Sequence, residues 1–152
     1  MKTLFTALTM TALFAASAGA HCQIPCGIYD DGARIAEMRE HVTTIAKSMK
    51  EIASLKPDSP QNSNQLVRWV NNKETHADKL TEIVTYYFMA QRIKPDSEQY
   101  DAKLKTLHSI IIECMKAKQT VDLAHVEKLR GLISTFAYLY IGHENMSHDQ
   151  GH

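Results

Sequence analysis

Apolar residues recur at intervals of three and four positions in the first part of the chain, which is the spacing of one face of a helix. This pattern covers residues 33–55 and ends at the run Lys-Pro-Asp-Ser-Pro, residues 56–60, because proline lacks the backbone donor that a helix needs. A second helical pattern covers residues 64–91 and stops near Pro95. The apolar positions are Ile35, Met38, Val42, Ile45, Met49 and Ile52 in the first pattern, and Leu66, Val70, Ala77, Leu80, Val84 and Tyr87 in the second.

Two more helical patterns follow. Asp96 and Ser97 are expected to cap the third helix, because short polar side chains accept hydrogen bonds from free backbone N–H groups. A weak break at residues 118–120 leads to the fourth helix, for which Gly142 is the expected end. The apolar positions are Tyr100, Leu104, Leu107, Ile111 and Cys114 in the third helix, and Val126, Leu129, Ile133, Phe136 and Tyr140 in the fourth.

These patterns predict an all-α fold. No stretch alternates apolar and polar residues over a strand's length. Four amphipathic helices with short links favour an antiparallel up-down-up-down four-helix bundle over residues 33–142, since that packing buries all four apolar faces at once. His41, His108 and His125 fall between the apolar positions and are expected at the surface. Residues 143–152 contain three histidines without periodicity and are expected to form a flexible tail.

Residues 1–20 have the features of an export signal. A lysine at position 2 precedes an uncharged apolar run at residues 4–16, and Ala18-Gly19-Ala20 matches the small-x-small pattern that signal peptidase cleaves. The apolar run of about 13 residues is shorter than the roughly 20 that a membrane span needs. We therefore expect export to a periplasm or beyond, with a mature chain that begins at His21 and is not held in a membrane.

Charge and cysteine content narrow the possible functions. Seventeen Lys and Arg balance 17 Asp and Glu, so the totals give no basic face that would indicate a nucleic-acid partner. The three cysteines, Cys22, Cys26 and Cys114, all follow the leader. Exported proteins usually pair their cysteines in disulfides, and an odd number fits that use poorly. Cys114 lies on an apolar helical face and is expected to be a buried core thiol.

The new N-terminus, residues 21–32, carries the candidate chemistry. Cleavage gives His21 a free α-amine beside its imidazole, and Cys22 follows with a backbone amide nitrogen and a thiol. The amine, the amide and the Cys22 thiolate can close two fused five-membered chelate rings, and Cys26 can supply a fourth donor after the turn at Pro25 and Gly27. Two nitrogens and two thiolates in one plane suit Ni(II) or Cu(II).

The run His21-Cys22-x-x-Pro25-Cys26-Gly27-x-Tyr29 resembles the nickel hook of nickel superoxide dismutases. The resemblance implies a four-helix bundle assembled as a homohexamer, with one nickel ion per chain. It implies that superoxide is the substrate and is converted to O2 and H2O2 while nickel alternates between Ni(III) and Ni(II). It also implies that His21, Cys22 and Cys26 bind the nickel, and that Tyr29 lines a small anion pocket over it.

The chain departs from the family pattern near the hook. Family members have a carboxylate in the first helix and an arginine in the second that steady the histidine imidazole; here Ala36 matches the carboxylate, with Glu37 beside it, and His76 matches the arginine. Tyr87 resembles a second tyrosine near the family's pocket. Gln23 and Asp31 replace a family aspartate and a family proline, respectively.

Three alternatives stay open from the sequence. Cys22 and Cys26 could form a disulfide in an oxidising compartment, which would remove the thiolates that a metal needs. The chain could be an exported nickel- or copper-binding or metal-delivery protein without turnover, using the hook and the tail histidines. A thiol–disulfide protein is a third possibility, and it would not need His21 at the terminus.

Overall fold

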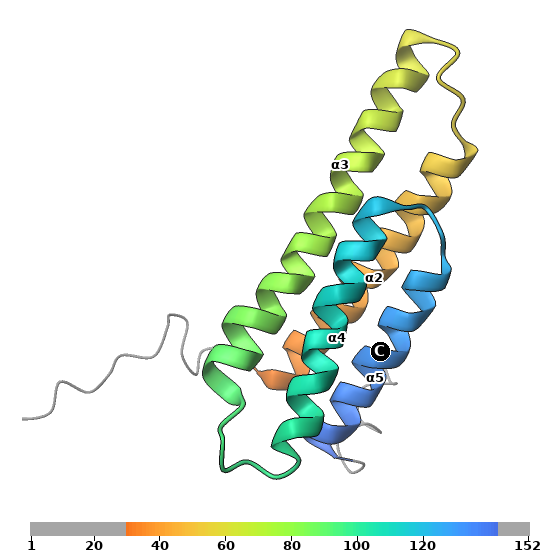
Figure 1. The fold of residues 1–152 in the computed structure, drawn as a ribbon. Helices are drawn as coiled ribbons and strands as arrows, with labels where there is room; N and C mark the ends of the chain where they lie inside the picture. Colours follow the sequence, from red (N-terminus) through yellow and green to blue (C-terminus); the bar gives the residue numbers. More distant parts are fainter. Residues whose placement is uncertain (1–29, 143–152) are drawn as a thin grey trace, which may run out of the picture.

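A computed structural model describes residues 30–142, and this part of the chain forms a bundle of helices without a strand (Figure 1). The chain order is α2 (Asp31–Ser54), α3 (Pro60–Glu82), a π-helix η2 (Ile83–Arg92), α4 (Tyr100–Gln119) and α5 (Ala124–Ile141). The helix α3 continues directly into η2. The leader, His21, Cys22, Cys26, Tyr29 and the tail lie outside the described residues.

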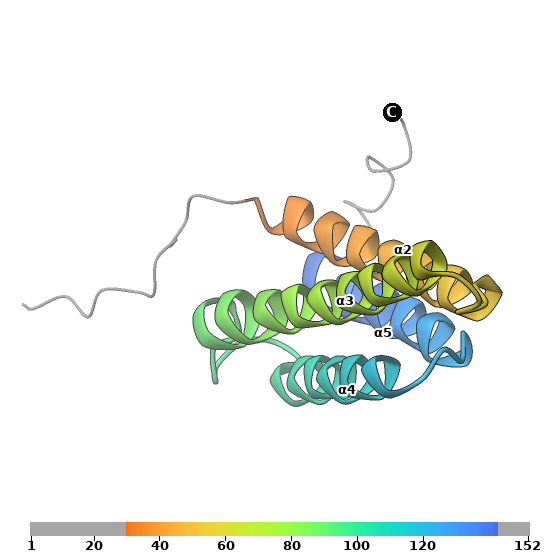
Figure 2. The same ribbon diagram turned by 90° about the horizontal axis from the view of Figure 1, so that it is seen from above.

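The helices pack as an antiparallel square. The helix α2 packs against α3 and α5, and α4 packs against the same two helices (Figure 2). The predicted four-helix bundle is therefore confirmed. Along residues 30–142 none of the helices is apolar over a stretch long enough to cross a membrane.

Local chemistry explains most of the helix ends. Asp30 caps α2 by accepting a hydrogen bond from the backbone N–H of Gly32 at 2.7 Å. Ser59 caps α3 in the same way, and Pro60 occupies the first turn, where a missing N–H does no harm. Gly142 ends α5 at a φ of +79°, a conformation that side chains with a Cβ rarely adopt. The breaks predicted at residues 56–60 and at Gly142 are confirmed.

The predicted cap of the third helix is wrong. The helix α4 begins at Tyr100, preceded by Gln99 in the left-handed region at a φ of 55°, without a side-chain cap. Ser97 instead belongs to a turn, in which its N–H donates to the carbonyl of Lys94 at 2.9 Å and its carbonyl accepts from Tyr100. The chain reverses direction within the short link between η2 and α4, and the backbone of Ser97 belongs to that reversal, while α4 begins three residues later without a side-chain cap.

The core is a continuous apolar cluster drawn from all the helices. Phe88 and Phe136 meet edge to face at its centre, with ring centroids 4.7 Å apart. Most of the predicted apolar positions are buried, but Val70 is exposed. The reason is length: Lys73 already meets the C-terminal end of α4, so the first part of α3 projects beyond α4 and α5 together with the end of α2 (Figure 1).

Candidate functional site

The candidate hook is joined directly to the N-terminal end of α2. Tyr29 is two residues from Asp31 and Cys26 is five residues from it, so their Cα atoms lie within about 7 Å and about 18 Å of that of Asp31. The N-terminus of α2, the π-helix η2 and the C-terminus of α5 meet at this end of the bundle (Figure 1). We call it the hook end.

Four side chains form a polar cluster at the hook end, the Asp31 cluster. Tyr140 of α5 donates its hydroxyl proton to Asp31 Oδ2 at 2.8 Å, and Arg92 Nε donates to Asp31 Oδ1 at 3.0 Å. The Tyr87 hydroxyl also donates to Asp31 Oδ1, and Arg92 Nη2 donates to the Tyr87 oxygen at 3.0 Å. One carboxylate therefore ties α2 to η2 and to α5.

The surroundings keep both phenols of the cluster protonated. Burial, followed by the hydrogen bond to Asp31, raises the pKa of Tyr140 and that of Tyr87 above the ordinary value. The guanidinium carbons of Arg92 and Arg34 lie 4.8 and 5.4 Å from the centre of the Tyr87 ring. Positive charge thus surrounds Tyr87 at the hook end, while Asp31 supplies the charge that balances Arg92.

Glu37 and His76 are brought together through a third residue, His41. The Nδ1 atoms of His41 and His76 are 3.0 Å apart, and His41 Nε2 is 3.8 Å from Glu37 Oε1. Arg34 donates to the other oxygen of Glu37 at 2.5 Å. The prediction that His41 is at the surface is wrong: α2 packs against both α3 and α5, so its buried face is wider than the apolar stripe.

A nickel site has few possible donors in the described part of the chain. Residues 30–142 contain no group of three or more His, Cys, Asp and Glu side chains that could hold a metal ion. Cys114 is a buried free thiol, as predicted, and burial raises its pKa to about 12. A thiol that stays protonated is a poor ligand. The candidate donors predicted from the sequence, His21, Cys22 and Cys26, lie outside the described residues.

The family model for nickel-containing superoxide dismutases matches residues 16–144. This chain belongs to the nickel-containing superoxide dismutase family. The match spans the candidate hook and every helix described here. It confirms the predicted function: the protein is a nickel-dependent oxidoreductase that converts superoxide to O2 and H2O2. No curated protein and no solved structure matches the chain.

The histidine pair gives this dismutase a group that sequence reasoning missed. A hydrogen bond between two Nδ1 atoms requires one ring to donate and the other to accept, so the pair takes up one proton at most before the contact breaks. Burial, with repulsion from His76, lowers the pKa of His41, and burial with nearby Lys79 lowers that of His76. At neutral pH His41 and His76 are therefore a neutral pair, whereas an arginine at position 76 would be a fixed cation.

Two members of the Asp31 cluster, Arg92 and Tyr140, have no feature in the sequence that predicts a polar role at this site. The family resemblance points to Tyr87 and to Asp31, whereas the sequence predicts Tyr140 as an apolar helix position and gives Arg92 no role. Tyr87 and Arg92 are five residues apart, and an α-helical reading with about 3.6 residues per turn places such residues on different faces. They meet because the π-helix has i→i+5 geometry.

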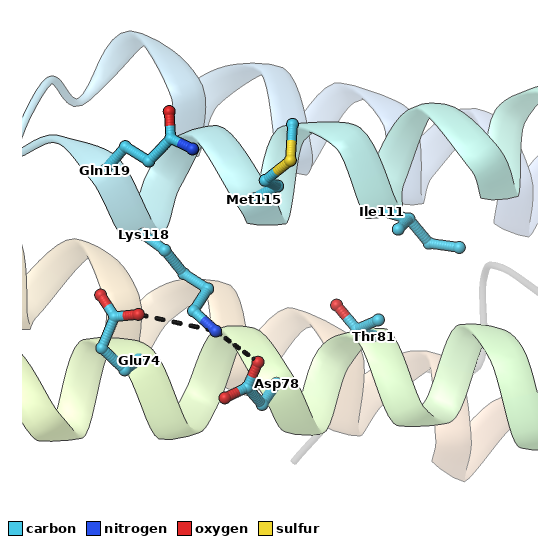
Figure 3. Close-up of a pocket in the computed structure, with 7 residues that line it drawn as sticks. All are labelled: Glu74, Asp78, Thr81, Ile111, Met115, Lys118 and Gln119. Atoms are coloured by element: carbon cyan, nitrogen blue, oxygen red, sulfur yellow. Dashed lines mark hydrogen bonds and ion pairs between the residues drawn. The ribbon is translucent and has the colours of Figure 1, made fainter.

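The hollow between α3 and α4 is a separate feature (Figure 3). Lys118 reaches across it, 2.7 Å from Asp78 Oδ1 and 3.6 Å from Glu74 Oε2. Hydrogen bonding to Asp78 raises the pKa of Lys118, which therefore stays charged and pairs with both carboxylates. The hollow is therefore crossed by an ion pair that joins α3 to α4, and both of its carboxylates are engaged by Lys118 and not free for a metal.

Proposed function

We propose that the dismutase holds one nickel ion per chain, bound by the amine and imidazole of His21, the amide and thiolate of Cys22 and the thiolate of Cys26. The family match, which extends over all three residues, is the observation that carries this proposal. The buried, protonated Cys114 leaves Cys22 and Cys26 as the thiols able to bind. A planar N2S2 set suits Ni(II).

The roles of the hook residues follow from their chemistry. Bound nickel supplies a one-electron redox couple for the conversion of superoxide. The anionic thiolates of Cys22 and Cys26 would favour the higher oxidation state of bound nickel, and the His21 imidazole would supply a further nitrogen donor that lowers the reduction potential. Tyr29 lines the approach of the small anion, where its hydroxyl can donate a hydrogen bond.

Glu37 and His76 are our candidates for steadying the His21 imidazole, acting through the contacts that they make with His41. Both residues contact His41, so we treat Glu37, His41 and His76 as one unit. Tyr87 supports the hook from the hook end of the bundle, through its hydrogen bond to Asp31. Because the described unit is neutral at the histidines, it would orient the imidazole by hydrogen bonding more than by charge.

Export and assembly complete the proposal. Cleavage after Ala20 frees the His21 amine, so the enzyme works in a periplasm or outside the cell. We also propose a homohexamer. The apolar residues Val67 and Val70 on the projecting part of α3 are exposed in the single chain, and they support a partner surface there. Sedimentation of the nickel-loaded protein tests the assembly.

The test uses the mature protein, beginning at His21 and loaded with Ni(II). We expect one nickel per chain and turnover near the diffusion limit, both lost when one residue is added before His21, because the extension converts the amine into an amide. Cys114→Ser is the matched thiol control and should keep nickel and activity. If the extended chain kept both, the hook assignment would be wrong, and nickel without turnover would indicate a carrier site.

A further inference from the structure

The Asp31 cluster lies where the hook meets the bundle and joins segments that are far apart in the chain. Asp31 is separated from Tyr87 by 56 positions and from Tyr140 by 109. Tyr87 is buried, and Tyr140 stacks on Phe136 and meets Phe88 edge to face, so both tyrosines are fixed by the core. The carboxylate of Asp31 is thus held by groups that cannot easily move.

The π-helix η2 is the feature that makes this arrangement possible. In an α-helix, two residues five apart point about 140° away from each other, since each residue turns the helix by about 100°. In η2 the i→i+5 geometry brings Arg92 Nη2 onto the Tyr87 oxygen, and Gln91 reaches the carbonyl of Tyr86 in the same way. π-Helical segments are rare and often occur at functional sites.

We propose that Asp31, Tyr87, Arg92 and Tyr140 are positioning residues for the nickel hook, because they fix the point at which the hook leaves the bundle. The inference rests on the hook assignment proposed above. Tyr29 is two residues before Asp31, so a shift of Asp31 moves the point at which the hook joins the bundle. Without the cluster, the first turn of α2 would lose its side-chain ties to η2 and α5 and would keep the Asp30 cap, so it would fray more readily.

Small displacements matter at such a site. A metal centre needs its ligands held to within about 0.5 Å, and residues that support the ligands affect metal affinity or activity by about 10- to 100-fold when changed. A carboxylate that accepts hydrogen bonds from three side chains on two other elements is suited to that task. A proline, which the resemblance places here in better-known family members, has no carboxylate and could not accept these hydrogen bonds.

The experiment compares Asp31→Asn and Tyr140→Phe with the parent in the mature, nickel-loaded protein. Asparagine keeps the size of the side chain but cannot accept from all three donors. Phenylalanine keeps the ring packed on Phe136 and removes only the hydroxyl. The readouts are the rate at which a chelator removes nickel and the electron paramagnetic resonance spectrum of the oxidised centre.

Glu113→Gln is the matched control. Glu113 is also a buried carboxylate with three partners, but it lies about 20 Å along α4 from the hook end. We expect nickel loss to be about 10-fold faster in Asp31→Asn, with a changed spectrum, and the same trend to a smaller extent in Tyr140→Phe. Glu113→Gln should lower stability while both nickel readouts stay at the parent values.

Two results would overturn the inference in different ways. If Asp31→Asn lowered thermal stability but left the release rate and the spectrum at parent values, the cluster would be a structural clamp only, and the hook assignment would stand. If the parent chain extended by one residue before His21 held nickel as well as the parent, the hook assignment itself would fail, and this inference with it.

Discussion

Replacing Glu113 by glutamine should cost about 2 kcal/mol of folding free energy. Its side chain is 3% exposed and lies between α4 and α5. Lys128 and Lys116 donate to Oε1 at 2.7 and 3.1 Å, and His125 Nδ1 is 2.8 Å from Oε2. Burial by itself raises the pKa of Glu113, but the hydrogen bonds from Lys128, His125 and Lys116 bring it down from 4.5 to about 2.

The magnitude follows from that pKa. The fall in pKa from 4.5 to about 2 between the unfolded and folded states corresponds to about 3.5 kcal/mol, at about 1.4 kcal/mol per pH unit. Lys116 and Lys128 are 43% and 58% exposed, so solvent screens part of this interaction, and we take about 2 kcal/mol. The loss stays below the 3–5 kcal/mol typical of breaking a buried ion pair, because both freed ammonium groups can turn to water.

The assay is urea unfolding followed by far-ultraviolet circular dichroism, at one protein concentration, from about pH 7 down to about pH 3. A folded-state pKa below the unfolded one gives stability that is present above about pH 4.5 and is lost as pH falls towards about 2. The difference in free energy of unfolding between the parent and Glu113→Gln should therefore shrink as pH falls through that window. Glu127→Gln is the control, since Glu127 is 74% exposed and 3.6 Å from Arg130, and it should change stability by at most about 0.5 kcal/mol.

Either of two results would refute this reasoning. One is a Glu113→Gln variant at neutral pH that is no less stable than Glu127→Gln, which would mean that the desolvation of the carboxylate cancels its hydrogen bonds. The other is a gap that stays constant down to about pH 3, which would mean that the charge of Glu113 is not the source of the stability.

Two further predictions concern other buried polar groups. Burial lowers the pKa of His41 and of His76, so the folding free energy that the neutral histidines contribute is present above about pH 6.5 and is lost as pH falls below it. Replacing both by glutamine should remove this loss of stability between about pH 7 and pH 5 in the same unfolding assay. Changing the exposed His108 should leave the loss in place. Lys73→Met should cost about 1–3 kcal/mol, because the buried Nζ donates to the carbonyls of Lys118 and Thr120 at the end of α4; a neutral effect in urea unfolding would contradict that role.

The four helices and most of their ends were predictable, because they depend on neighbours in the chain; the cap of α4 was the exception. The three-and-four spacing of apolar residues, the prolines at 57 and 60 and the glycine at 142 act within a few residues of their own position. The family could be recognised for the same reason, since the hook motif occupies one short run of sequence. These features need no knowledge of what packs against them.

Contacts between helices were decided only by the tertiary structure. Val70 is exposed because α4 ends before reaching it, and His41 is buried because α2 packs against two helices at once. Arg92 and Tyr140 reach Asp31 because a π-helix changes which residues share a face and because α5 ends beside the start of α2. Helix length, rotation and neighbour set these contacts, and a periodicity measured within a single helix contains none of the three.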